Sequence, residues 1–107
     1  MAIKHAESGE VIDIRPLGAS LNDHTTRALA KTDHLELIRM VLPAGKEIRE
    51  HKAPREITVQ CIEGAIEFNC HGATQRLEGG QMLFLNPREP HSVKAVEDSA
   101  VLVTMVL

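Results

Sequence analysis

Apolar and polar residues alternate with a period of two along much of the second half of this chain. In residues 65–70, Ile66 and Phe68 fall on one face of an extended segment, and Glu67 and Asn69 fall on the other. Successive side chains of a β-strand point to opposite sides, so this alternation is typical of a strand with one buried face. It predicts that this part of the chain folds into short strands.

The same reading predicts several more strands. They cover residues 34–42, 46–51, 57–63, 82–85, 92–96 and 100–107. Residues 34–42 and 100–107 are apolar on both faces, and such strands need cover on both sides. We therefore expect residues 100–107 to form a central strand. A hairpin turn is predicted at Glu63 and Gly64, because glycine reaches positive φ without a steric penalty.

The first third of the chain has a weaker pattern. Residues 1–10 are polar and predict a loose arm, and residues 11–14 predict a short strand that Pro16 and Gly18 end. Residues 25–30 predict another strand, with a short helix over residues 26–31 as the alternative. We divide the single domain into an arm with the first strands, residues 1–33, and a barrel, residues 34–107.

About eight to ten short strands with turns between them and little helix indicate an all-β sandwich or barrel. The 107 residues are enough for one domain. They are few for covering several strands that are apolar on both faces. We therefore predict a homodimer, in which a second copy supplies part of the cover.

Composition and charge narrow the function classes. Hydrophobic residues make up 43% of the chain and charged residues 25%, which is typical of a globular domain. The net charge of −3 and the lack of a basic run argue against a nucleic-acid partner. Residues 1–10 lack the apolar segment of a signal peptide, and residues 100–107 are too short to span a membrane. We expect a cytoplasmic protein with no membrane partner.

Two residue types exclude further classes of site. In a reducing compartment Cys61 and Cys70 are expected to be free thiols, and their separation fits no zinc pair. The chain has two phenylalanines and neither tryptophan nor tyrosine. A pocket would therefore have few aromatic platforms for nucleotides, flavonoids or carbohydrates.

Two segments that each begin with a glycine deliver one histidine each. Gly45 is followed after five residues by His51, with Gly64 further on, and Gly80 precedes His91. This framework resembles the two motifs of the cupin superfamily. The resemblance implies a jelly-roll barrel of the cupin type, a double-stranded β-helix.

The resemblance covers residues 34–107 and includes clear departures. Ala53 stands where the first motif has its second histidine, and Ile57 where it has glutamate; Asn86 and Arg88 replace the proline and glycine of the second motif. In the family, three histidines and the glutamate usually bind one divalent metal. Two of those four ligands are present here.

The resemblance makes His51 and His91 the candidate metal ligands. Imidazole nitrogen suits divalent transition metals, and we consider Fe, Ni, Mn or Zn. Gln60 is the favoured third ligand, although alternation turns it away from Ile57's face unless a bulge intervenes. Glu56 is the second candidate. In the alternative interpretation, both histidines are hydrogen-bonded pocket residues or lie half-exposed at the barrel mouth.

Arg39 interrupts an apolar strand, and a charge on a buried face needs a partner. An interface salt bridge is the favoured interpretation, ahead of a bound anion. The remaining histidines are expected to face solvent, with His71 in a turn. They are His5, His24, His34 and His71.

Three function classes remain open at this point. The first is a single-domain cupin that binds a small molecule in a degenerate pocket built around two histidines, with or without a metal. The second is a metal-dependent enzyme such as a dioxygenase or isomerase, in which Glu56 or Gln60 acts as acid, base or orienting group. The third is a dimeric accessory protein with a vestigial pocket. The missing anionic ligands favour the first class over the second, and no residue is assigned as catalytic.

Overall fold

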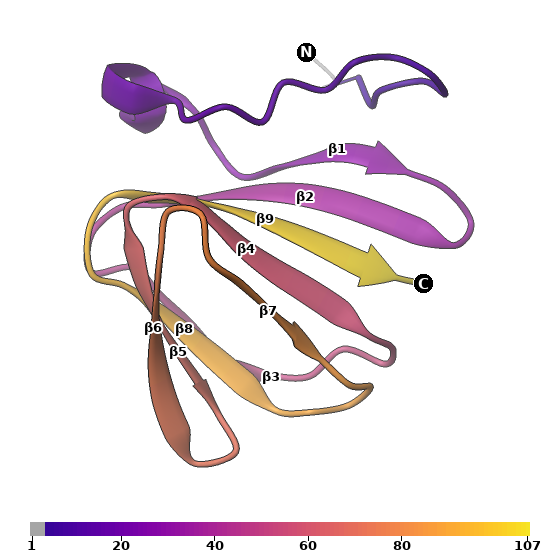
Figure 1. Ribbon diagram of the computed structural model, residues 1–107. Helices are drawn as coiled ribbons and strands as arrows, with labels where there is room; N and C mark the ends of the chain where they lie inside the picture. Colours follow the sequence, from indigo (N-terminus) through magenta and orange to yellow (C-terminus); the bar gives the residue numbers. More distant parts are fainter. Residues whose placement is uncertain (1–3) are drawn as a thin grey trace.

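Two antiparallel β-sheets pack face to face in the computed structural model, which describes residues 4–107 (Figure 1). The five-stranded sheet has the order β1-β2-β9-β4-β7, and the four-stranded sheet has the order β3-β8-β5-β6. The strands are β1 (Arg27–Lys31), β2 (Leu35–Leu42), β3 (Glu47–His51), β4 (Ile57–Glu63), β5 (Ala65–Cys70), β6 (Ala73–Glu78), β7 (Met82–Leu85), β8 (His91–Ala95) and β9 (Ser99–Val106). The predicted all-β jelly roll is confirmed.

The core lies between the two sheets and follows the predicted alternation. On β4, Ile57, Val59 and Cys61 are buried, whereas Thr58 and Gln60 between them are partly exposed. Fully buried side chains from β5, such as Phe68 and Ile66, meet them from the opposite sheet. As predicted, β9 is central in its sheet, where it pairs with β2 on one side and β4 on the other.

The N-terminal segment differs from its prediction in part. Residues 11–14 form no strand, and Val11 is 91% exposed. The segment lies over the outer side of β1 and β2 (Figure 1), and residues 11–14 form no backbone hydrogen-bond ladder with the edge strand β1. The strand predicted over residues 25–30 is present as β1, and the helical alternative is wrong.

The arm is tied to the barrel at both ends. Near its start, the backbone N–H of Ala6 donates to the carbonyl oxygen of Leu29 at 2.8 Å. Near its end, the Glu63 carboxylate accepts the backbone N–H groups of Leu17 at 2.7 Å and Gly18 at 3.1 Å. A 3-10 helix that was not predicted, η1 (Gly18–Asp23), follows and buries Leu21.

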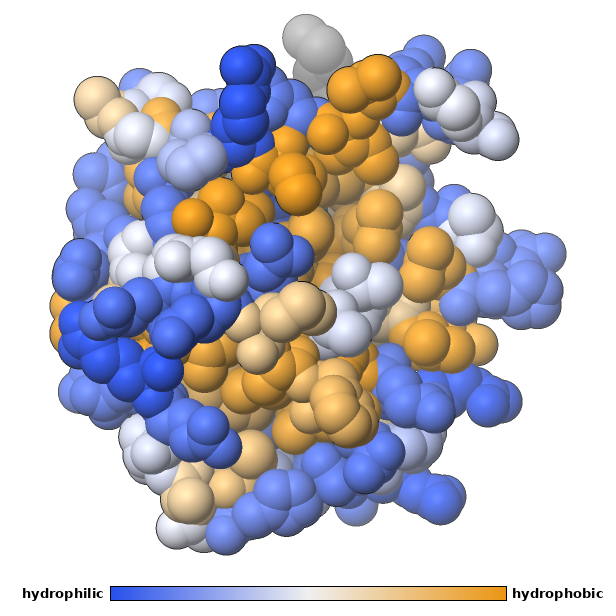
Figure 2. Space-filling model, viewed as in Figure 1, coloured by the Kyte–Doolittle hydropathy of each residue, from blue (hydrophilic) through white to orange (hydrophobic). Residues whose placement is uncertain are grey.

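The arm and η1 cover β1, β2 and one end of β9 and β4, where Leu21 packs with Val41, Ala100 and Ile62. Over the rest of β9, β4 and β7 the outer face is bare, and Figure 2 shows apolar side chains gathered there. Met82 is 58% exposed and Phe84 68% exposed on β7. Among the described residues, no helix has the length and apolar character needed to cross a membrane.

Candidate functional site

A cavity of about 270 Å³ lies inside the barrel between the two sheets. Its walls are almost entirely aliphatic. They include Ile38, Met40, Val101 and Val103 from the five-stranded sheet and Ile66, Phe68 and Val93 from the four-stranded sheet. His51, His91 and Lys52 are the polar side chains in this lining. The cavity is therefore an apolar chamber with its polar chemistry concentrated on two adjacent imidazoles and one ammonium group.

His51 and His91 lie directly opposite each other in the β3–β8 pair. Their ring centroids are 4.2 Å apart, with an interplanar angle of 61°. On its other side the His91 ring stacks on Phe68, at 5.4 Å and 12°. The structure thus brings together the two histidines that the sequence places forty residues apart, and Phe68 fixes the orientation of one of them.

A backbone hydrogen bond sets the tautomer of each histidine. The Nδ1 atom of His51 lies 2.9 Å from the carbonyl oxygen of Arg49, and the Nδ1 atom of His91 lies 2.9 Å from the carbonyl oxygen of Glu89. A carbonyl oxygen only accepts, so Nδ1 must carry the proton in both rings. In the neutral state each Nε2 then has a free lone pair, and no donor from residues 4–107 reaches it.

Burial keeps His91 neutral. The side chain is 4% exposed, and desolvation lowers the pKa of His91 below its ordinary value, with a smaller lowering from His51. The hydrogen bond to Glu89 acts in the opposite direction. At neutral pH the His91 Nε2 atom is therefore an acceptor or a metal ligand, and it has no proton to donate.

The positions that the cupin motif fills with a histidine and a glutamate point inward here but carry apolar groups. Ala53 and Ile57 both line the cavity. Gln60, the favoured third ligand, is paired with Met82 and Leu102 on the outer face of the five-stranded sheet. No bulge reverses the alternation between Ile57 and Gln60, so the structure does not bring Gln60 together with the histidines.

The second candidate for a third ligand also lies apart from the pair. Glu56 is exposed and is not part of the cavity lining. Within residues 4–107, no group of three or more His, Cys, Asp or Glu side chains is placed to hold a metal ion. Two neutral nitrogens in an apolar chamber fit a divalent metal only in part, because nothing in the lining offsets its charge.

Two features of the site were not singled out in the sequence. Phe68 was predicted to face inward, but its stacking on His91 depends on the diagonal offset between β5 and β8. Lys52 follows His51 directly, just after β3 ends, and it is part of the cavity lining. Neither signal is visible in residue spacing alone.

Comparisons with known proteins agree with this architecture. The model of the Cupin domain family matches residues 38–107. A conserved protein of unknown function from Streptococcus pyogenes is similar over 99% of this chain and 94% of its own, at 24% identity and a TM-score of 0.76. KdgF from Halomonas sp. is similar over 76% of each chain, at 23% identity and a TM-score of 0.71.

A larger protein is also similar. Salicylate 1,2-dioxygenase from Pseudaminobacter salicylatoxidans is 25% identical over 66% of this chain, with a TM-score of 0.64, and the match spans 20% of the dioxygenase. The comparison with curated proteins finds no match.

Proposed function

The chain belongs to the cupin family, and we propose that its barrel cavity binds one small, largely apolar molecule whose polar end meets His51 and His91. One observation carries this proposal: two imidazoles with free Nε2 lone pairs, whose ring centroids are 4.2 Å apart, lie at the polar end of an aliphatic chamber. The acceptors of two adjacent rings are satisfied by a guest that brings a donor or a cation to them.

The size of the chamber limits the guest. At about 30 Å³ for each water molecule of liquid volume, 270 Å³ corresponds to roughly nine waters, or a molecule of about ten non-hydrogen atoms. The aliphatic walls favour a compact hydrocarbon body, and a hydroxyl group can donate to Nε2. Lys52 adds one positive charge to the lining, which suits a carboxylate.

A compact hydroxy acid combines these properties. The name of the similar salicylate 1,2-dioxygenase supports this class, since salicylate is a small aromatic hydroxy acid. The present chain spans one fifth of that enzyme, so we propose binding of the ligand class and not the reaction.

A metal-dependent reaction is the second candidate, and the free Nε2 atoms favour it. His51 and His91 would supply two nitrogens, and the remaining positions would fall to oxygens of the guest. A metal held this way supplies Lewis acidity to the guest's oxygen atoms. The chain itself orients both rings through the carbonyl oxygens of Arg49 and Glu89, and aliphatic side chains form the walls around them.

The ligand proposal is tested by calorimetric titration of the untagged protein with salicylate and with benzoate, which lacks the hydroxyl group. We expect saturable binding of salicylate and a weaker response to benzoate. The double variant His51→Ala, His91→Ala should lose the difference between the two acids, and His71→Ala should keep it because His71 is exposed outside the cavity. Equal binding by the wild type and the double variant would contradict the proposal.

The metal question has its own measurement. Untagged protein is dialysed against Fe, Ni, Mn or Zn with and without salicylate, and bound metal is quantified by mass spectrometry. Metal retained at one equivalent only with salicylate, and lost in the His51→Ala, His91→Ala variant, supports the second candidate. Salicylate binding that is unchanged by metal and by chelator contradicts the second candidate and supports ligand binding without a metal.

We also propose that two copies pair through the bare outer face of β9, β4 and β7. The face is uncharged in its centre, where Thr58 and Gln60 lie between Thr104 and Leu102 on one side and Phe84 and Met82 on the other. Pairing through this centre therefore brings no charged side chains of the two copies together. Sedimentation should show a dimer that Phe84→Lys dissociates and Val96→Lys, on another exposed site, does not.

A further inference from the structure

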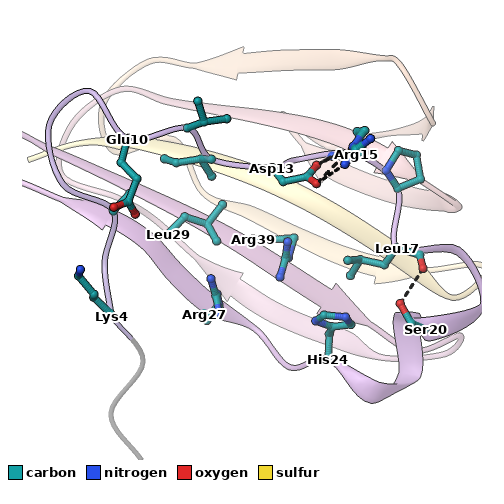
Figure 3. Close-up of a pocket in the computed structure, with 14 residues that line it drawn as sticks. Lys4, Glu10, Asp13, Arg15, Leu17, Ser20, His24, Arg27, Leu29 and Arg39 are labelled. Carbon is teal, nitrogen blue, oxygen red and sulfur yellow. Dashed lines mark hydrogen bonds and ion pairs between the residues drawn. The ribbon is translucent and has the colours of Figure 1, made fainter.

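A second hollow, about 600 Å³, lies between the N-terminal arm and the outer face of β1 and β2 (Figure 3). It is on the opposite side of the sheet from the barrel cavity. Four of the side chains that line it are cationic and two are carboxylates. The cations are Lys4, Arg15, Arg27 and Arg39, and the carboxylates are Glu10 and Asp13. We call this hollow the arm cleft.

Two arginines stand directly opposite each other at the base of the arm cleft. Arg27 on β1 and Arg39 on β2 are cross-strand partners, so their side chains leave the same face of the sheet. Both side chains line the cleft (Figure 3). Like charges directly opposite in a sheet repel each other. Among residues 4–107, neither arginine forms an ion pair with a carboxylate.

Arg39 is also deeply buried. It is 6% exposed, and its Nε atom has no hydrogen-bond partner among the described residues. Leu17 and Leu29 lie on either side of it in the cleft (Figure 3). A buried donor of a charged group without an acceptor is costly, and in folded proteins such groups are nearly always satisfied.

The carboxylates of the cleft do not meet this need. Asp13 is engaged by Arg15, whose Nη2 and Nε donate to it at 2.7 Å and 3.0 Å. This hydrogen bonding from Arg15 holds the pKa of Asp13 at about 2, and the charge of Arg39 adds a smaller lowering. Glu10 lies beside Lys4 at the other end of the cleft in Figure 3.

We propose that the arm cleft binds a small oxyanion, a carboxylate or a phosphate group, between Arg27 and Arg39. A planar guanidinium can donate two parallel hydrogen bonds to two oxygens of such a group, and the Nε–H of Arg39 is one of these donors. A bound oxyanion satisfies this buried donor and separates the two like charges. The site is separate from the barrel cavity, because Ile38 and Met40 face the barrel while Arg39 faces the cleft.

The test observes the Arg39 Nε–H group directly. The ¹⁵N-labelled protein is titrated at constant ionic strength in two separate experiments, one with inorganic phosphate and one with acetate. Chloride is the balancing ion in both. The Arg39 cross-peak is assigned by its loss in Arg39→Lys. We expect a saturable shift of this cross-peak with one or both oxyanions and none with chloride. The oxyanion that binds more tightly identifies the group, carboxylate or phosphate, that the cleft prefers.

Variants separate a specific site from general charge. Arg27 is exposed, so Arg27→Gln leaves the fold intact; it should weaken binding by about 10-fold or more, as expected for losing a charged hydrogen bond. Arg55→Gln removes the same charge from an exposed residue between β3 and β4, outside both cavities, and should leave the affinity unchanged. Equal weakening by both variants, or an Arg39 cross-peak that neither oxyanion moves, overturns the proposal.

A second copy of the chain is the competing occupant. If an acidic side chain from another copy satisfied Arg39, the protein would sediment as a dimer that Arg39→Gln dissociates, in phosphate-free buffer. That result would also overturn the proposal.

Discussion

Substitution of Gly64 by alanine should destabilise the protein strongly, because two separate costs meet at this residue. Gly64 lies between β4 and β5 and has φ of +83°, a region that alanine enters at a cost of about 1–2 kcal/mol. A Cβ atom built on Gly64 would also lie 2.8 Å from Ser99 Cα, and closer still to the Ser99 side chain and the Asp98 carbonyl oxygen.

The magnitude follows from adding the two terms. Overpacking against backbone that must shift typically costs about 1–3 kcal/mol. The sum is roughly 2–5 kcal/mol, and at about 4 °C per kcal/mol for a domain of this size it lowers the melting temperature by about 8–20 °C. Urea or thermal unfolding followed by circular dichroism measures this loss.

Gly45→Ala provides the matched control. Gly45 has φ of +86°, but no atom lies within 4 Å of its Cβ position. The conformational term is the same, and so is the gain from restricting the unfolded chain. Gly45→Ala should therefore cost only about 1–2 kcal/mol. Equal destabilisation by the two variants would refute the idea that Gly64 is required by the close approach of β9.

Three further predictions concern buried polar groups. The fold lowers the pKa of His91 below its ordinary 6.5, so in acid the unfolded chain binds more protons than the folded protein. The contribution of His91 to the free energy of unfolding is therefore complete above pH 6.5, and it falls as the pH drops toward the folded pKa. His91→Phe should flatten this part of the urea-unfolding profile between neutral pH and pH 5, and an unchanged slope would argue against a buried neutral imidazole. Ser99 is fully buried and its Oγ accepts the backbone N–H of Ala65 at 3.0 Å, so Ser99→Ala should cost about 1–3 kcal/mol in the same assay, whereas a neutral effect would mean that water replaces the hydroxyl. Burial raises the pKa of the Cys61 thiol, so native protein at pH 7.5 should react with iodoacetamide far more slowly than urea-unfolded protein, and comparable rates would contradict the packed core.

The strands of the barrel were predictable because their signal is local. Alternation in residues 57–63 and 65–70 is read from neighbouring residues, and the structure confirms β4 and β5. The hairpin predicted at Glu63 and Gly64 is wrong, because the turn leads from one sheet into the other and β4 does not pair with β5. Cys61 and Cys70 are free thiols, as predicted on the expectation of a reducing compartment. Residues 11–14 have strand-like composition, but a strand also requires a partner, and pairing depends on contacts distant in sequence.

The histidine pair was predictable for a different reason. The glycine-histidine spacing of a known barrel motif fixed where His51 and His91 would meet, and they are cross-strand partners. Gln60 shows the limit of this reasoning, since a third ligand there required a bulge that β4 does not contain before Cys61. Arg39 was recognised as a buried charge in need of a partner. The arm that forms the cleft around it folds back from twenty or more residues away, and no local pattern reports that.

The strand β2 separates the arm cleft from the barrel cavity. Its odd and even positions open into different spaces, Arg39 into one and its neighbours Ile38 and Met40 into the other. The backbone ties these three residues rigidly together, so occupants on the two sides share a single partition. Any influence that one guest exerts on the other's dissociation constant must be returned by the same factor, since linkage between two equilibria is symmetric.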